Sequence, residues 1–280
     1  MRKVKRSLEL NIKYFLLRRT PILILSMERT GSTAMLSSLK SRGELVIGSH
    51  YLDPQKLGTK KFSGSARWAC KHIIRNRKPA KVIALVRSPF ENMLSTFARS
   101  DYGEQELLAS GSDNQSEQLS SERLSEDFRR TYLETDRYLW PLGWFDVEFR
   151  PTLGIDVFEH PFDQENGFAR IHAEPYDALI LRTELPDEQK VKIVADFLEI
   201  PNFEMTRPAA ASENRGRLPS GKPGENTYYA AKYKALKECA VFPHKYVDSI
   251  IGSRHVQHFF SQKERDDMAL KYGAKVPQQS

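Results

Sequence analysis

Several features that would assign this chain to a common class are scarce or missing. The 280 residues include only two cysteines, Cys70 and Cys239, which are too few and too far apart for a disulfide framework, and no CxxC pair indicates zinc. The longest apolar run near the start, residues 21–27, is far shorter than a membrane span. Charges within residues 13–19 interrupt any signal-peptide pattern. The sequence therefore predicts a soluble cytoplasmic protein.

Positive charge is in excess and is unevenly distributed. The net charge is +7, and residues 1–19 hold seven Lys or Arg and one Glu, a charge of +6. Residues 103–127 hold seven Asp or Glu and one Arg, a charge of −6, and we expect them to form a polar, mobile insertion. A basic body suits a phosphate-rich ligand. No nucleic-acid motif is present, so nucleic acid is not an expected partner.

Residues 3–19 are predicted to form an amphipathic helix. Its apolar residues fall near one face; they are Val4, Leu8, Ile12, Phe15 and Leu16. One interpretation is a packing helix with a solvated opposite face. The other is peripheral contact with an anionic membrane surface.

The rest of the chain alternates apolar strands with helices, which favours a parallel sheet. The predicted strands are 21–26, 45–47, 81–86 and 178–181. The predicted helices are 32–41, 64–77, 89–99, 128–140, 187–199, 228–238 and 245–251. We predict an α/β fold with a P-loop-like parallel sheet flanked by helices, a helical insertion and a helical C-terminal part. The domain would cover residues 20–270, between the helix of residues 1–19 and a polar tail at 271–280.

A first phosphate motif reads Met-Glu-Arg-Thr-Gly-Ser-Thr over residues 27–33 and lies between a predicted strand and helix. Gly31 lets the backbone approach a phosphate, and the helix N-terminus offers free amides. Arg29 adds a cation that can fork onto phosphate or sulfate oxygens. Three hydroxyl groups add donors, from Thr30, Ser32 and Thr33. The Walker lysine of a nucleotide kinase is missing.

A second motif follows the strand at residues 81–86. Arg87-Ser88-Pro89 comes directly after this strand, and Ser95 lies eight residues after Arg87 on the next helix. Ligands of parallel sheets gather at the carboxyl ends of the strands. Arg87 and Ser95 could therefore share a second phosphate.

Together the two motifs resemble those of the sulfotransferase superfamily. The first is similar to its 5′-phosphosulfate loop, and RSPFENMLS, residues 87–95, is similar to its 3′-phosphate motif. The resemblance implies that 3′-phosphoadenylyl sulfate is the co-substrate, that a hydroxyl is the acceptor and that no metal is needed. In sulfotransferases a late basic loop closes over the nucleotide. Arg215 and Arg217 are candidates for that role, and a solvated loop is the alternative.

Three further stretches are similar to a bacterial family of capsular polysaccharide synthesis proteins. They are WFDVEFRPTLGIDVFEHPFDQENGFARI at residues 144–171, ALILRTELP at 178–186 and HVQHFFSQKER at 255–265. This resemblance implies a carbohydrate acceptor such as a capsular or cell-surface glycan. It also leaves open a catalytically silent nucleotide-binding protein of glycan assembly. A phosphoryl-transferring P-loop enzyme is the third alternative.

His50 is the predicted catalytic base. It follows the second strand, at the same sheet edge as Arg29 and Arg87, and imidazole is suited to proton transfer at neutral pH. Glu28 and Asp53 are the rivals. Asp53 could instead orient the His50 ring.

Overall fold

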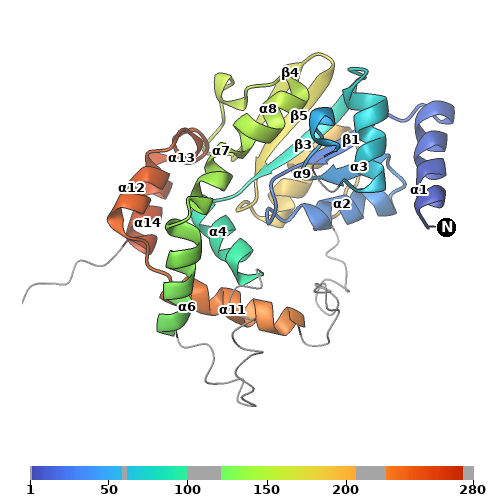
Figure 1. Cartoon of the computed structure of the whole chain (residues 1–280). Helices are drawn as coiled ribbons and strands as arrows, with labels where there is room; N and C mark the ends of the chain where they lie inside the picture. The colour runs from blue at the N-terminus through green and yellow to red at the C-terminus, as the bar shows by residue number, and fades with distance from the viewer. Residues whose placement is uncertain (1, 59–61, 100–120, 206–224, 274–280) are drawn as a thin grey trace, which may run out of the picture. The chain divides into compact units, whose positions relative to one another are not determined.

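The computed structural model describes residues 2–58, 62–99, 121–205 and 225–273 (Figure 1). By compactness the chain divides into a first unit, residues 1–87 and 143–208, and a second unit, residues 88–142 and 209–280. This partition is finer than the predicted domain over residues 20–270, which stays a prediction.

The first unit is built on a sheet that, within the described residues, has five strands in the order β2-β1-β3-β5-β4. The strands are β1 Ile22–Leu25, β2 Val46–Ser49, β3 Ala80–Val86, β4 Phe168–Ala173 and β5 Tyr176–Arg182. β1 pairs in parallel with both β2 and β3, and β3 pairs in parallel with β5. The parallel pairs bring the carboxyl ends of β1, β2, β3 and β5 to one sheet edge. The predicted α/β fold with a mostly parallel sheet is confirmed.

The sequence did not predict β4, which is antiparallel to β5. It carries Arg170 and His172, whose side chains alternate with the buried Ala169 and Ile171. Such alternation is typical of an antiparallel strand with one solvated face. The predicted strands were found as continuous apolar runs, and β4 lacks one.

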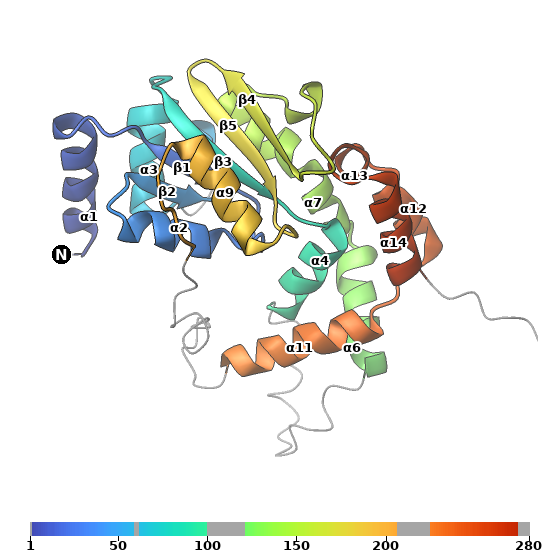
Figure 2. The same cartoon turned by 180° about the vertical axis from the view of Figure 1, so that it is seen from behind.

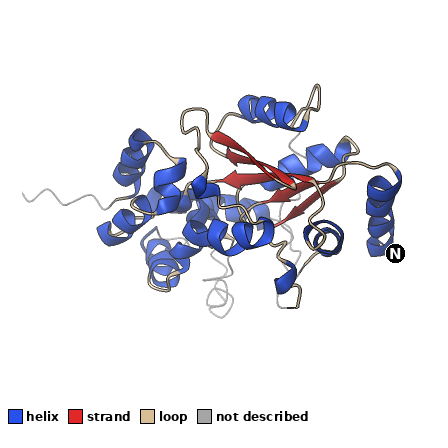
Figure 3. Cartoon of the chain, turned by 90° about the horizontal axis from the view of Figure 1, so that it is seen from above, coloured by secondary structure: helices blue, strands red, loops and turns tan. Residues whose placement is uncertain are grey.

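Helices cover both faces of this sheet, as Figures 2 and 3 show. α2 Ser32–Ser41 and α9 Asp187–Leu198 pack on one face, where Met35, Leu39 and Phe197 join the apolar residues of the strands. The other face is covered by α3 Gly64–Ala69 with the π-turn η3 Cys70–Ile74, and by η6 Phe145–Phe149 with α8 Arg150–Leu153 (Figure 1). Two 3-10 turns complete the unit, η2 Pro54–Lys56 and η7 Val157–Glu159.

A glycine sets how closely α2 approaches β2. A Cβ added to Gly48 would lie 2.7 Å from Leu36 Cδ2, inside van der Waals contact. Any other residue there would require the Leu36 side chain to change position. Gly48 therefore lets Leu36 of α2 lie directly against β2.

The N-terminal helix is α1 Arg2–Asn11, and it continues as the π-turn η1 Ile12–Leu16. The predicted helix over 3–19 therefore ends three residues early. Leu10 is buried, and the Trp68 indole Nε1 donates a hydrogen bond to Asn11 Oδ1 over 2.7 Å. α1 thus packs on α3 through Leu10, a residue outside the predicted apolar face.

The named elements of the second unit, over its described residues, are all helices, and one isolated β-bridge joins Phe242 and Gly273. Its elements are α4 Pro89–Ala98, α6 Ser121–Phe128, η4 Arg129–Leu133, η5 Arg137–Leu139, α11 Glu225–Cys239, α12 His244–Ile251, α13 Arg254–Phe259 and α14 Gln262–Tyr272. α7 Trp140–Trp144 spans the boundary between the units. Aromatic rings form the core of the second unit. The Phe90 ring stacks on the Tyr272 ring at 4.6 Å between centroids, and the Phe242 ring meets the Phe90 ring edge-on at 5.0 Å.

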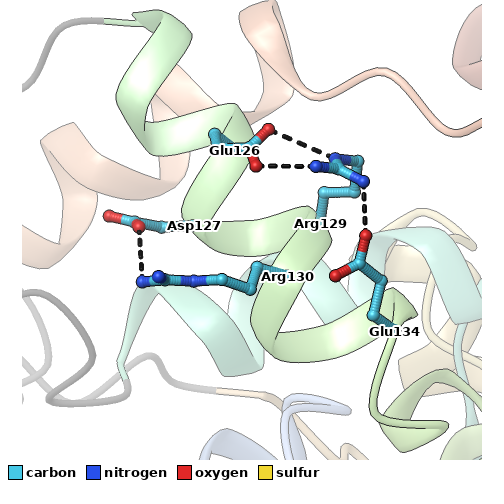
Figure 4. Close-up of polar contacts among 5 residues, drawn as sticks. All are labelled: Glu126, Asp127, Arg129, Arg130 and Glu134. Atoms are coloured by element: carbon cyan, nitrogen blue, oxygen red, sulfur yellow. Dashed lines mark hydrogen bonds and ion pairs between the residues drawn. The ribbon is translucent and has the colours of Figure 1, made fainter.

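The expected insertion over 103–127 overlaps α6, so its last seven residues are helical. Leu124 and Phe128 are buried and lie one turn apart, and this apolar pair anchors the helix. Ion pairs follow along α6 and η4 (Figure 4): Arg129 contacts Glu126 and Glu134, and Arg130 contacts Asp127. These side chains are mostly solvated, so the pairs add little stability. Residues 103–120 lie outside the described residues.

Glu91 of α4 links three helices of the second unit. Its carboxylate accepts hydrogen bonds from the Tyr272 hydroxyl over 2.6 Å, from Lys271 Nζ over 2.9 Å and from the Tyr233 hydroxyl. Burial alone would raise its pKa, but the two tyrosine hydroxyls and Lys271 together lower the pKa of Glu91 to about 2. The charged Glu91 carboxylate therefore connects α4 to α11 and α14 through hydrogen bonds.

Candidate functional site

Ser26 joins three strands of the first unit at the carboxyl edge of the sheet. Its hydroxyl accepts a hydrogen bond from the Leu85 amide over 2.9 Å, and its own amide donates to Ser49 O over 3.3 Å. The paired register of β1 with β3 ends at Ile24 and Ile83. The Ser26 side chain therefore extends the connection to β3 beyond the last paired residue. It fixes the point where the residue 27–31 loop begins.

The loop itself is shaped by two residues in left-handed conformation, Arg29 with φ 63° and Gly31 with φ 77°. A Cβ on Gly31 would meet nothing within 4 Å, so the dihedral angle, rather than space, favours glycine. Gly31 is also the N-cap of α2 and makes no side-chain cap. The first amides of α2 thus have no side-chain cap and no intrahelical acceptor.

The Thr30 side chain makes a hydrogen bond within the loop, and its predicted contact with a ligand stays a prediction. Its hydroxyl donates to the Met27 carbonyl oxygen over 2.9 Å, and its side chain is buried. Thr30 therefore tightens the loop with its hydroxyl and would meet a ligand through its backbone amide. Ser32, half-buried, begins α2, and Thr33 is exposed on the first turn. Their predicted role as donors to a ligand stays a prediction.

Arg87 brings the two sequence motifs together. It follows the last residue of β3, and its guanidinium Nη1 donates a hydrogen bond to the carbonyl oxygen of Arg29 over 2.7 Å. Both side chains are half-buried. Two arginines that are 58 positions apart in sequence therefore belong to one constellation at the sheet edge.

Three other predicted residues are not placed at this edge. Ser95 is half-buried on α4 and belongs to the second unit, so the sharing of one phosphate by Arg87 and Ser95 stays a prediction. Arg215 and Arg217 lie outside the described residues. Their role over a nucleotide also stays a prediction.

His50 lies one residue past β2 and is held by the loop. Its Nδ1 lies 2.7 Å from the Ser26 carbonyl oxygen. A carbonyl oxygen can only accept, so Nδ1 carries the proton and Nε2 of the neutral ring carries the lone pair. The backbone therefore selects the tautomer that a base acting through Nε2 requires.

The structure corrects the second role considered for Asp53. The carboxylate Oδ1 accepts a hydrogen bond from the Gln55 amide over 2.9 Å and caps η2. Ser26, rather than Asp53, holds the His50 Nδ1. The reason is topological, because β1 and β2 are neighbours and their ends meet.

Two glutamates lie near the tyrosine next to His50. Burial raises the pKa of Tyr51 most, and the negative charges of Glu28 and Glu148 raise that pKa further. Glu28 is exposed, whereas Glu148 is 2% exposed and lies 3.0 Å from Lys56 Nζ. Sequence reasoning did not single out Glu148 or Lys56, because they are 92 positions apart. The available signal was the presence of acidic residues, Asp146 and Glu148, among the aromatic residues of 144–149.

Arg182 is a second residue that sequence reasoning missed. It ends β5 opposite Val86 and is 5% exposed. The pattern was visible: the apolar strands at 81–86 and 178–181 are each followed by arginine. Arg182 therefore places a further cation at the carboxyl end of a parallel strand, with its Nε 3.0 Å from where a Cβ on Gly167 would lie.

The geometry defines an α/β protein in which a strand–loop–helix connection, residues 27–31, lies at the carboxyl edge of the sheet. Over the parts of the chain that the structure describes, no group of three or more His, Cys, Asp or Glu could hold a metal ion. A family model described as "NKWYS: Putative capsular polysaccharide synthesis protein" matches residues 139–261. This stretch is similar to that family and begins after Arg29, His50 and Arg87. No curated protein and no solved structure matches the chain.

Proposed function

We propose that this protein transfers a sulfo group from 3′-phosphoadenylyl sulfate to a hydroxyl of a carbohydrate. The observation that carries the proposal is the 2.7 Å hydrogen bond from Arg87 to the Arg29 carbonyl. It supports the interpretation of the two motifs as one site for a ligand with two phosphate groups. Arginine suits such a ligand because its fork matches phosphate and sulfate oxygens.

The roles of the residues follow from charge. The free amides at the start of α2 and the Arg29 guanidinium would hold the phosphosulfate, since a helix N-terminus favours anions. The acceptor oxygen forms a bond to sulfur as the sulfur–oxygen bond to the 5′-phosphate breaks. Arg29 would stabilise the negative charge that develops on the departing oxygen. The leaving group is adenosine 3′,5′-bisphosphate.

His50 would remove the proton of the acceptor hydroxyl. Its Nδ1 is occupied by Ser26 O over 2.7 Å, so Nε2 is the atom that accepts the proton. Glu28 is the rival, but its negative charge beside the loop would repel an anionic donor. The proton, the electron pair and the sulfo group are then all accounted for without a metal ion.

The name of the matched family supports the choice of acceptor, because capsular polysaccharides carry many hydroxyl groups. We further propose that the protein works in the cytoplasm. Its two cysteines are free, and burial raises the pKa of the Cys70 thiol to about 12. Such an inert thiol fits a reducing compartment.

The first test is ligand-induced stabilisation. Adenosine 3′,5′-bisphosphate at about 100 times its dissociation constant should add about 2.7 kcal/mol to the free energy of unfolding. Adenosine 5′-phosphate, which lacks the 3′-phosphate, is the matched control and should stabilise less. A folded protein whose melting temperature is unmoved by millimolar bisphosphate would remove the proposal.

The second test measures the reaction. The protein is incubated with donor labelled in the sulfo group and with glycans from its own host, and the labelled product is identified. Labelled glycan supports transfer. Tight bisphosphate binding without any labelled product would instead favour the silent nucleotide-binding protein. A magnesium-dependent transfer of phosphate would favour the phosphoryl-transferring enzyme.

A further inference from the structure

The N-terminal helix exposes a row of large apolar side chains. The exposed fractions are 58% for Leu8, 38% for Ile12, 54% for Phe15, 74% for Leu16 and 60% for Leu17. We call these five residues the apolar strip. They make up half of the exposed large hydrophobic residues found over the described parts of the chain. A single exposed leucine is ordinary, but a contiguous apolar patch marks an interaction surface.

The helix packs on α3 and η3 mainly through residues outside the strip, and within the strip the Phe15 ring lies edge-on to the His72 ring of η3 at 5.6 Å between centroids. Leu10 is 1% exposed, and Asn11 accepts the hydrogen bond from Trp68. Leu8, Ile12 and Leu16 recur every four residues, so they lie above one another along the helix. The π-turn ends with the Leu17 amide bonded to Ile12 O over 3.0 Å. The helix is therefore already packed by one face, and its most apolar residues remain in solvent.

Positive charge accompanies the strip. Residues 1–19 carry seven Lys or Arg and one Glu, and Arg18 and Arg19, which follow Leu17 directly, are exposed. Lys13 is paired with Glu9 over 2.9 Å, which neutralises that acidic residue. The surroundings of the strip are thus basic. A purely apolar partner surface would leave this charge uncompensated.

We infer that the apolar strip binds an anionic membrane surface. A helix with an apolar face and a basic flank lies in the plane of the bilayer, with the apolar side chains between the headgroups and the cations near the phosphates. No described helix is long and apolar enough to cross a membrane, and a surface position requires none. This binding goes beyond the proposed sulfo transfer, because the strip shares no residue with the candidate site.

Vesicle co-sedimentation tests the inference with the full chain. The vesicles are phosphatidylcholine alone, or phosphatidylcholine with phosphatidylserine. Binding should require phosphatidylserine and should weaken with salt, because the Debye length falls from about 10 Å at 0.1 M to about 3 Å at 1 M. Each basic residue near the surface contributes about fivefold in partition coefficient. The double variant Arg18→Gln, Arg19→Gln should therefore bind about 25-fold more weakly.

Two more variants separate the strip from general hydrophobicity. Leu8→Gln with Leu16→Gln should lose vesicle binding by about tenfold or more, since both side chains would enter the headgroup region. Leu270→Gln is the matched control, because Leu270 is 84% exposed on α14, away from the strip. All variants alter exposed residues, so melting temperatures should match the wild type. Stabilisation by adenosine 3′,5′-bisphosphate should also be unchanged, whichever way the proposed function is decided.

Three outcomes would overturn the inference. Equal binding to both kinds of vesicle would show that anionic lipid is not recognised. Equal binding by the Leu8 and Leu16 variant would remove the strip from the interaction. A wild type that sediments as a dimer without binding vesicles, and becomes monomeric with the Leu8 and Leu16 changes, would assign the strip to a second copy of the chain.

Discussion

The guanidinium of Arg87 holds the carbonyl oxygen of Arg29 at 2.7 Å. This contact makes the end of β3 a support for the loop that follows β1. Any change at Arg87 therefore acts on two levels, on its own charge and on the conformation of Arg29. The substitutions below are chosen to separate these effects.

Arg87→Ala should weaken the binding of adenosine 3′,5′-bisphosphate more than the binding of adenosine 5′-phosphate. The lost contact to a charged group is worth about 1.5–3 kcal/mol. The dissociation constant of adenosine 5′-phosphate divided by that of the bisphosphate should therefore fall about 10-fold to 150-fold. Isothermal titration with both nucleotides measures this ratio. Loosening of the Arg29 loop would weaken both nucleotides alike. An unchanged ratio would therefore show that Arg87 supports the loop and does not read the 3′-phosphate.

Arg29→Ala should lower turnover more than donor affinity. A hydrogen-bonding group that points at charge developing in the transition state acts mainly on kcat. Removing one such group lowers the rate by about 10²–10³. Steady-state kinetics with labelled donor gives kcat and KM separately. If only KM changes, Arg29 binds the ground state and the transition state equally well.

His50→Asn should lower turnover by about 10²–10⁴ and leave bisphosphate binding intact. The Asn side-chain amide can donate to Ser26 O as Nδ1 does, so the loop keeps its support while the basic nitrogen is lost. His50→Ala removes both features and is the comparison. Full activity in the Asn variant would exclude His50 as the base and direct attention to Glu28.

Glu91 should make the second unit sensitive to acid. Its pKa is lowered to about 2 in the folded chain, from an ordinary value of 4.5. The carboxylate therefore contributes stability that is fully present above the ordinary pKa and is lost as the pH falls toward about 2. Hydrogen bonds to a charged group are worth about 1.5–3 kcal/mol, and Glu91→Gln should lose about that much near neutral pH.

Urea unfolding near pH 7 and near pH 3 checks this sign. The difference in unfolding free energy between wild type and Glu91→Gln should shrink at the lower pH, because the Glu91 carboxylate of the unfolded chain, with its ordinary pKa of 4.5, is largely protonated there. Glu204→Gln, which alters an exposed loop residue, is the control and should show no such trend. If the difference in unfolding free energy between wild type and Glu91→Gln is the same at both pH values, the charged Glu91 carboxylate does not stabilise the second unit.

The sequence predicts the parallel part of this fold well, because buried parallel strands are continuous apolar runs. All four predicted strands overlap strands in the structure, and α2 begins and ends at the predicted residues 32 and 41. β4 and the helical turns over 140–153 were missed, because their apolar residues alternate with charges that only tertiary pairing explains. Glu148 next to Lys56 is such a case.

The candidate site shows the same division. Arg29, Gly31, His50 and Arg87 could be predicted because each follows or precedes an apolar strand or helix. The contacts that orient them could not be predicted. Ser26 O on the His50 ring, and the Thr30 hydroxyl turned into the loop, are hydrogen bonds to backbone carbonyls. Such bonds leave no residue pattern.

The left-handed backbone conformation of Arg29 lowers the stability of the folded chain. A residue with a Cβ in this conformation costs about 1–2 kcal/mol, and Arg29 adopts it with φ 63°. Glycine would relieve that strain and would also delete the guanidinium. Selection for a more stable chain would therefore favour glycine at this position. With arginine at this position, the folded protein combines a strained backbone with a cation at the loop.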